Sequence, residues 1–217
     1  NGLLGMGWSM GGFSVIHRCG ATIAIDGFKG GVNYDVNDRF CLDGERLIWD
    51  AAKGFYRTQH ESWQKIDYSG SATDPTSFTV TSKDGTVRYY GDTTDSRIEA
   101  APLSNGQTRT VARLWALSKI QDRNSNYLTI TYTEENALGD FRPFYILYTG
   151  NATAGIAPYS YIFFEYVLRS DVTPLYEAGS KISTTQRLTS IKSYAVGFSL
   201  ARKYLLNYDN NGAVGRS

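Results

Sequence analysis

The sequence predicts an all-β protein, built as an antiparallel meander of variable hairpins, with a β-sandwich as the alternative architecture. Aromatic residues make up 14% of the 217 residues, and 16 residues are tyrosines, which favour pleated strands. The 22 glycines and only five prolines suit strands joined by tight turns. Apolar residues show no sustained stripe with helical spacing, for example over residues 180–188, so we expect only a few short helical turns.

The chain begins with a glycine-rich run, residues 2–19, which we expect to form a loop leading into the first strand. Gly2 and Gly5 suit a loop better than a buried strand. The glycines permit positive backbone torsions and close approach of the chain. The apolar residues of the run are expected to supply buried surface: Trp8, Met10, Phe13, Val15 and Ile16.

Within this run, residues 7–11 fit the Gly-x-Ser-x-Gly pattern of a hydrolase nucleophile elbow, centred on Ser9. The context disagrees, because an elbow needs a buried strand before the serine and a helix after it, and Gly11-Gly12 would open a helix badly. The two histidines are His17 and His60, which leaves His60 as the one plausible base. We therefore expect no enzyme activity, and a serine hydrolase using Ser9 is the second alternative function.

Two Asp-Gly pairs interrupt apolar segments and predict hairpins. Residues 78–82 and 87–90 alternate in polarity around Asp84-Gly85, and residues 40–49 repeat the pattern around Asp43-Gly44. Asp-Gly is the pair that a two-residue primed turn selects, because that turn needs positive torsions. We expect such a turn in both hairpins.

A third hairpin is predicted from residues 111–120 and 128–132, joined by a turn over residues 122–126. Trp115 and Leu117 fall on one face of the first strand. The spacing of two places Ile120, Ile130 and Tyr132 on one buried face, and Thr129 and Thr131 on the opposite, outward side.

Further strands are expected at residues 162–168 and 204–208. We pair Tyr145-Ile146 with residues 164–166, and residues 188–191 with residues 206–209, as degenerate copies of the third hairpin. The loops between paired strands differ in length, so the sequence does not support a solenoid or propeller with a fixed repeat.

The glycine-rich run also carries a family resemblance. Gly2-Leu-Leu-Gly5-Met-Gly7-Trp8-Ser9-Met-Gly11-Gly-Phe-Ser-Val-Ile-His-Arg18-Cys19, followed by Asp26-Gly27, resembles the SpvB-like N-terminal domain of bacterial Rhs/YD-repeat toxins of the toxin complex B-component type. The resemblance continues in order through residues 31–35, 38–47, 90–91, 95–99, 126–132, 148–151, 169–174 and 187–192. The structural motif residues are Gly5, Gly7, Trp8, Gly11, Cys19, Cys41, Ile120, Asp122 and Tyr132. Ser125 stands where the Rhs/YD turn would have glycine.

This resemblance implies a non-catalytic scaffold segment of a secreted bacterial virulence toxin. It would contribute to a β-sheet shell that carries or encloses an effector encoded elsewhere. In the family's name-giving member, the actin-modifying ADP-ribosyltransferase lies in a separate C-terminal domain. The implied partners are other segments of the same toxin polypeptide, a partner toxin subunit, or a host cell-surface component, and no cofactor is expected.

The ends of the chain suggest a single domain, residues 1–217, excised from a longer protein. The first residue is Asn1 rather than methionine, and Ser217 follows shortly after a strand-like stretch. A sheet cut from a shell leaves unpaired strand edges, so we expect the isolated chain to associate. The weak point should be the apolar residues of the glycine-rich run: Leu3, Leu4, Met6, Trp8 and Met10.

Charge and hydropathy exclude two classes of partner. The 22 basic and 21 acidic residues give a formal charge of +1, which offers no attraction to nucleic acid or to an anionic membrane surface. No apolar stretch is long enough to span a membrane.

The candidate ligand sites in the sequence are weak. Cys19 and Cys41 are expected to pack as small apolar groups, with a disulfide, or metal ligation together with His17, as alternatives. Residues 33–38 space oxygen atoms like a calcium loop but lack its central glycine and distal glutamate, so we expect a solvated turn and no metal.

A carbohydrate-binding or cell-surface-binding β module is the first alternative function. Exposed Trp63, Tyr159 and Tyr161 could stack on the apolar faces of sugar rings. The acidic residues suggest no acid and base pair and are expected on solvated strand faces: Glu61, Asp67, Glu134, Glu135, Glu165 and Asp171.

Overall fold

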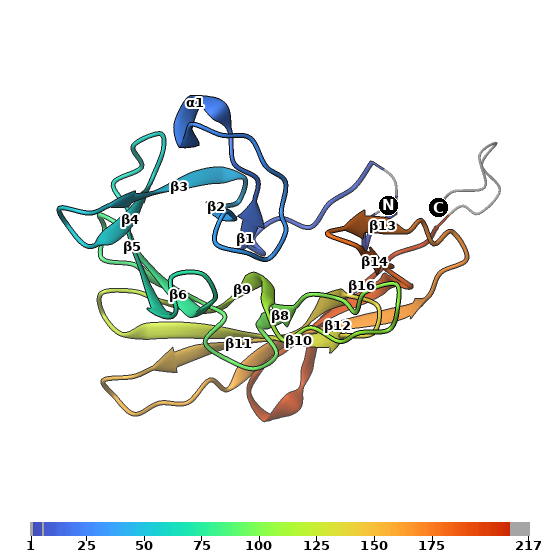
Figure 1. Cartoon of the computed structure of the whole chain (residues 1–217). Helices are drawn as coiled ribbons and strands as arrows, with labels where there is room; N and C mark the ends of the chain where they lie inside the picture. Colours follow the sequence, from blue (N-terminus) through green and yellow to red (C-terminus); the bar gives the residue numbers. More distant parts are fainter. Residues whose placement is uncertain (1, 6, 209–217) are drawn as a thin grey trace.

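The computed structural model describes residues 2–5 and 7–208, and its regular structure is almost entirely β (Figure 1). The strands are β1 (Val15–Cys19), β2 (Arg39–Leu42), β3 (Glu45–Asp50), β4 (Phe55–Thr58), β5 (Lys65–Gly70), β6 (Pro75–Thr81), β7 (Val87–Tyr90), β8 (Arg97–Glu99), β9 (Ala112–Gln121), β10 (Asn126–Glu135), β11 (Asp140–Asn151), β12 (Ser160–Leu168), β13 (Leu175–Glu177), β14 (Ser180–Ile182), β15 (Gln186–Tyr194) and β16 (Leu200–Leu205). The helical elements of this part of the chain are α1 (Ile23–Asp26) and the 3₁₀ turn η1 (Val196–Phe198). Neither described helix is long and apolar enough to cross a membrane.

The first half of the chain forms a closed, barrel-like sheet. Neighbouring strands pair from β1 to β7, β7 pairs with β9, and β9 pairs back with β1 through Ile16 and Trp115. All these pairings are antiparallel, which confirms the predicted fold class. Closure leaves the ring without a free edge, so a barrel rather than the alternative sandwich is the architecture of this half.

The second half forms an outer sheet that grows from the barrel wall. β9 continues past the barrel, and the sheet runs through β10, β11, β12, β15 and β16, below the barrel in Figure 1. Lys119 pairs on one side with Tyr89 of β7 and on the other with Thr129 of β10. β9 is therefore a wall of the barrel and the first strand of the outer sheet.

Every second residue of the barrel strands fills the interior, as the alternation of a strand requires. Ile66, Phe78, Val80 and Trp115 are buried to 1% exposure or less. The Trp115 ring meets Phe78 edge to face at 5.0 Å, and its indole N–H donates to the Pro75 carbonyl at 2.9 Å. These contacts make Trp115 the centre of the aromatic core.

The two Asp-Gly hairpins form as predicted, but their turns differ. Asp43 and Gly44 both have positive φ, 50° and 88°, which is the expected primed turn between β2 and β3. In the β6–β7 hairpin, Gly85 has a positive φ but Asp84 does not. The Ser82 amide donates to the Thr86 carbonyl. That loop has three residues, so the two-residue prediction is wrong for it, because Ser82 pairs with Thr86 and Lys83 joins Asp84 and Gly85 in the turn.

The β9–β10 hairpin forms as predicted, with Ile120 paired to Leu128. Ile130 and Tyr132 are 4% and 6% exposed, while Ile120 is partly buried against the same core. The predicted outward exposure of the threonines is wrong, because Thr129 and Thr131 are half-buried. Their cross-strand neighbours on β11 are Leu147 and Tyr145, whose large side chains flank them on the same face.

The later strands pair as expected but in different registers. β11 pairs with β12 through Tyr145 and Phe163, so the predicted partners at residues 164–166 lie farther along the strand. The loop over residues 152–159 sets this register. β16 ends at Leu205, although the Leu206 amide still donates to the Thr189 carbonyl of β15. Asp209 of the predicted strand pair lies outside the described residues.

Candidate functional site at the barrel mouth

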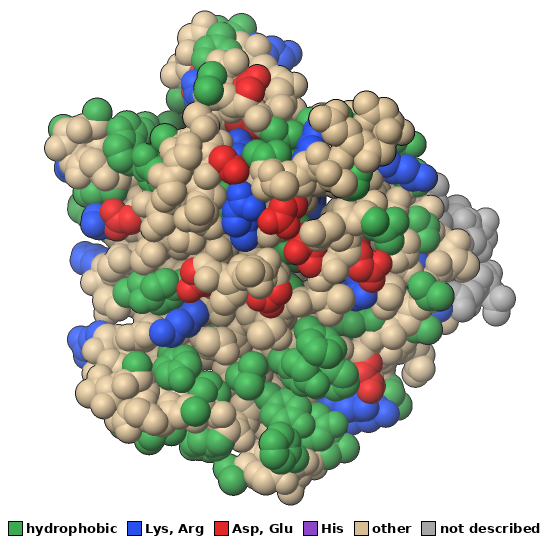
Figure 2. Space-filling model, turned by 60° about the horizontal axis from the view of Figure 1, so that its bottom comes forward, with side chains coloured by type: hydrophobic (Ala, Val, Ile, Leu, Met, Phe, Trp, Pro, Cys, Tyr) green, Lys and Arg blue, Asp and Glu red, His purple; other side chains and the backbone are tan. Residues whose placement is uncertain are grey.

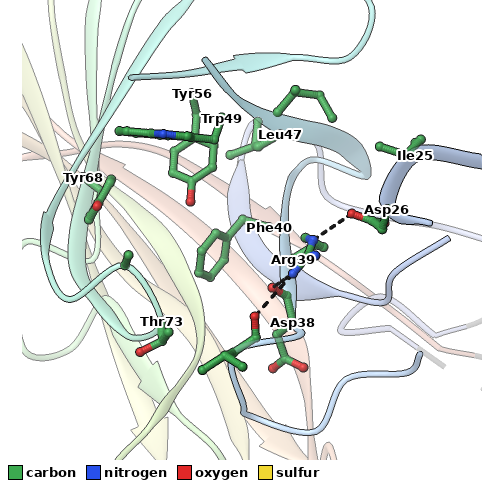
Figure 3. A pocket seen from close by; sticks show the side chains of 13 residues that line it. Ile25, Asp26, Asp38, Arg39, Phe40, Leu47, Trp49, Tyr56, Tyr68 and Thr73 are labelled. Atoms are coloured by element: carbon green, nitrogen blue, oxygen red, sulfur yellow. Dashed lines mark hydrogen bonds and ion pairs between the residues drawn. The ribbon is translucent and has the colours of Figure 1, made fainter. Parts of the chain in front are cut away.

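One end of the barrel opens into a pocket of about 550 Å³. Strands β2 to β5, helix α1 and the loop before β6 supply its walls (Figure 3). Phe40 and Leu47, which belong to the barrel core, are both part of its lining. The pocket therefore reaches the hydrophobic core of the barrel and does not lie only on its surface.

Three aromatic rings from adjacent strands form one wall of this pocket. Trp49 of β3 pairs directly with Tyr56 of β4, and their ring centroids are 5.0 Å apart. Tyr68 of β5 lies 5.8 Å from each of these rings. Burial raises the pKa of the Tyr56 hydroxyl, so this group stays protonated at neutral pH. Trp49 is 43% exposed and offers its ring to an incoming molecule.

Paired charges form the opposite side of the pocket. Asp26 of α1 accepts hydrogen bonds from Arg39 at 2.7 Å and from Arg46 at 2.6 Å. Burial alone would raise the pKa of Asp26, but the hydrogen bonds from the Thr22 amide and from both arginines lower it overall. The carboxylate is thus held ionised between two guanidinium groups.

The segment with calcium-like spacing, residues 33–38, ends at a second paired carboxylate. Asp38 is buried and accepts hydrogen bonds from the backbone amides of Asn33 and Tyr34, both at 2.8 Å. It also pairs with Arg18 at 3.3 Å. Since backbone amides and Arg18 occupy its oxygens, the segment is a turn tied to the barrel and only partly the solvated turn that we expected.

The Arg18 side chain fills the interior of the barrel next to the pocket, a role that the sequence did not predict. Its side chain is 1% exposed, donates to the Ala112 carbonyl at 2.7 Å and pairs with Asp74 at 3.0 Å. The guanidinium also lies 5.7 Å from the centres of the Phe40 and Trp115 rings. The available signal was the alternation in β1, which places Arg18 on the same face as the buried Ile16.

Cys19 and Cys41 form a disulfide, with their Cα atoms 6.0 Å apart. The expectation that they pack as separate apolar groups is therefore wrong, and so is the metal alternative for this pair. The two cysteines lie on β1 and β2, which are adjacent antiparallel strands, and this places the side chains within bonding range. Among residues 2–5 and 7–208, no three His, Cys, Asp or Glu side chains are grouped to hold a metal ion.

Ser9 is exposed in an irregular segment, residues 7–14, and the first described strand, β1, follows this segment rather than preceding Ser9. It lines a small apolar pocket of about 190 Å³ with Phe13, Tyr132 and other residues, none of which is a histidine. His60 instead contacts Glu45 at 2.8 Å in the loop after β4. The geometry therefore brings no base to Ser9.

The other motif residues of the glycine-rich run are placed separately. Gly5 is buried, Gly7 and Gly11 are exposed, and Gly7 is left-handed with φ 79°. Trp8 is 76% exposed, so the expectation that it supplies buried surface is wrong. The Leu188 amide donates to the Leu3 carbonyl, and this backbone contact holds the run without burying Trp8. Met6 lies outside the described residues.

The aromatic platform expected from Trp63, Tyr159 and Tyr161 does not assemble. Trp63 lies in the β4–β5 loop of the barrel under Lys83, whereas Tyr161 belongs to β12 of the outer sheet and stacks on Tyr194 at 4.6 Å. Tyr159 lines a different pocket, beside Tyr148. The rings that do gather around a cavity are those of the barrel mouth.

Two carboxyl groups meet where the barrel joins the outer sheet. The Glu99 amide donates to Glu134 at 3.2 Å, and burial followed by the charge of Glu99 raises the pKa of Glu134 to about 7. Spacing did not reveal this pair, because β8 and β10 bring it together. Asp171, expected on a solvated face, is instead buried against Arg169 at 2.7 Å.

No family model and no curated protein matches this chain. Among solved structures, the N-terminal domain of effector protein SpvB from Salmonella typhimurium strain LT2 is similar, with 17% identity and a TM-score of 0.74. The match covers 97% of this chain and 86% of that domain. A chain of the Photorhabdus luminescens Tc holotoxin pore matches 96% of this chain at 18% identity and a TM-score of 0.73. A chain of the TcdB2-TccC3 structure matches the same share at 17% identity and a TM-score of 0.72.

These similarities extend along nearly the whole chain. The match spans 13% of each Tc toxin chain, whereas it spans most of the SpvB domain. The fold implied by the sequence motifs is therefore confirmed. This chain has the fold of the SpvB N-terminal domain, a fold that also forms one segment of the much longer Tc toxin chains.

Proposed function

We propose that this chain is a non-catalytic scaffold segment of a secreted bacterial toxin of the Rhs/YD type. Residues 1–217 would form one domain of a β-sheet shell that carries or encloses an effector encoded elsewhere in the polypeptide or in a partner subunit. The observation that carries the proposal is the match of nearly the whole chain to a segment of Tc toxin chains.

The outer sheet supports this proposal, because it has a strand edge from which a shell could continue. β16 is the last strand on the path of the sheet and pairs on one side with β15. Leu200, Tyr204 and Leu205 of this strand are 54–66% exposed. An apolar edge strand is a template for another strand.

An apolar surface on the underside of the molecule points the same way. Figure 2 shows hydrophobic side chains gathered in a broad patch in the lower part of this face, with acidic and basic side chains interspersed above it. On the outer sheet, Tyr145 stacks on Phe163 at 4.9 Å, next to the stacked Tyr161 and Tyr194. Apolar patches of this kind are typical of surfaces that contact another protein segment.

The test measures association through β16. We expect the isolated chain to self-associate and bind a hydrophobic dye, and a protein extended with its native following segment to do neither. Tyr204→Lys, which places a charge on the edge, should restore the monomer, whereas Trp63→Lys, at an exposed site in the β4–β5 loop of the barrel, should not. Size-exclusion chromatography with light scattering gives the answer. A monomeric, dye-silent chain that gains no stability on extension would favour a self-contained binding module.

The absence of catalysis by Ser9 is tested separately. Ser9→Ala should leave esterase activity at background and change stability by less than about 1 kcal/mol, since Ser9 is exposed and has no base beside it. Stoichiometric labelling by a serine-reactive phosphonate that disappears in Ser9→Ala would contradict the scaffold proposal.

A further inference from the structure

We propose that the pocket at the barrel mouth binds an uncharged saccharide ring. This site is independent of the scaffold role, because it lies on the barrel and not on the edge of the outer sheet. Its volume of about 550 Å³ falls within the range of small-molecule sites.

The geometry of the three rings selects a ligand that stacks. Trp49, Tyr56 and Tyr68 lie 5.0–5.8 Å apart and meet at interplanar angles of 55–66°. At these distances the rings pack against one another, so a ligand would contact their open faces rather than enter between them. Because the rings are tilted against one another, a pyranose would stack its flat apolar face on one ring, and the 43% exposed Trp49 offers the largest.

The polar groups of the wall suit a ligand rich in hydroxyl groups. The Trp49 indole N–H and the hydroxyls of Tyr56 and Tyr68 form no hydrogen bond with any described residue. Each can donate to a ligand oxygen, and the two hydroxyls can also accept. A sugar ring presents both its apolar face and its hydroxyls to such a wall, whereas a purely apolar ligand would leave these groups without partners.

The charges of the pocket disfavour a cationic ligand. Asp26 lies between Arg39 and Arg46, and Arg39 also donates to the carbonyls of residues 36–38 and lies 5.2 Å from the centre of the Phe28 ring. Asp38 is held by Arg18 and by two backbone amides. Both carboxylates of the lining are therefore paired with guanidinium groups, so the pocket has little attraction for an ammonium group. Figure 3 shows Arg39 and Asp26 across the pocket from the aromatic wall, where they could hydrogen-bond to sugar hydroxyls.

Saturation-transfer NMR on this chain provides the test. The saccharide probes are maltohexaose, cellohexaose and chitohexaose. Choline and a decaproline peptide are the competing probes, because aromatic sites also bind quaternary ammonium groups and proline-rich peptides. We expect at least one oligosaccharide to bind and neither competitor to do so. Trp49→Ala should weaken that binding at least tenfold, and Tyr68→Phe, which keeps the ring and removes the hydroxyl, should weaken it less.

Trp63→Ala is the matched control, since Trp63 is also an exposed tryptophan of the barrel but lies outside the pocket. It should bind like the unmodified chain, and thermal unfolding would verify that each variant is folded. The inference is overturned if none of the three oligosaccharides gives a signal at 10 mM, if folded Trp49→Ala binds as well as the unmodified chain, or if decaproline or choline binds instead.

Discussion

Gly91 directly follows β7 and lies against the central tryptophan of the barrel. Its φ is 67°, and a Cβ atom there would stand 2.3 Å from Cδ1 of Trp115. The residue therefore meets two requirements at once, a left-handed backbone and the absence of a side chain. This explains why glycine is needed at the point where β7 leaves the barrel wall.

Gly91→Ala should destabilise the protein by about 3 kcal/mol or more, because Trp115 is fully buried and has no space to move. Gly44→Ala is the matched control. Gly44 is also left-handed, but a Cβ atom there meets nothing within 4 Å, so only torsional strain of about 1 kcal/mol is expected. Urea denaturation compares the two, and equal losses would show that the contact with Trp115 is unimportant.

Glu134 gives the molecule a pH dependence. Its pKa is raised from 4.5 to about 7 in the folded protein, chiefly by burial and then by Glu99. As pH rises from 4.5 to 7, the unfolded chain releases this proton before the folded protein does. The contribution of this group therefore lowers stability progressively across that range.

Glu134→Gln should stabilise the protein by roughly 1 kcal/mol at pH 8, after allowance for the solvent screening of a half-buried carboxyl, and by almost nothing at pH 4. The amide oxygen can still accept from the Glu99 backbone. Denaturation curves at the two pH values check this. A variant whose gain is independent of pH would contradict the assignment.

At the scale of elements, the β9–β10 hairpin provides a direct comparison of its two faces. Ile130→Ala should cost about 2–5 kcal/mol, since Ile130 is 4% exposed in the core between barrel and outer sheet. Thr129→Ala, one residue away on the half-buried face, should cost under about 1 kcal/mol. Chemical denaturation measures both, and similar losses would mean that the faces are equally important.

Hairpins were predictable because their signals are local. The alternation around Asp43-Gly44 and Asp84-Gly85 identified both, although the turn type depends on which residues close the loop, and the second loop is one residue longer than the first. The pairing of β1 with β9 was not predictable, because these strands are some hundred residues apart in sequence. In the sequence, both strands are only apolar segments, and nothing in the composition indicates that the sheet closes into a barrel.

The sequence did not reveal the candidate site for the same reason, because its residues come from separate strands. Trp49, Tyr56 and Tyr68 come from three strands, and each looks like an ordinary strand aromatic. The sequence drew attention to Trp63, Tyr159 and Tyr161 instead, which the fold separates. Only the register of β3, β4 and β5 shows which rings share a face.

At the scale of the whole molecule, stability should be highest along β9. Residues 114–118 of this strand are all buried, and its residues pair with neighbours on both sides. β16 is exposed throughout. Amide hydrogen exchange in β9 should therefore be about a hundredfold or more slower than in β16. Mass spectrometry of exchanged peptides can measure this, and comparable rates would contradict it.

The sharing of β9 has a mechanical consequence. β10 pairs with it at Lys119, Ile120 and Gln121, and the Tyr132 hydroxyl of β10 adds a hydrogen bond to the Leu117 carbonyl. A load that pulls the outer sheet away from the barrel is therefore carried by this short ladder and its few added contacts. Under such tension the molecule would bend first at the junction of β9 and β10.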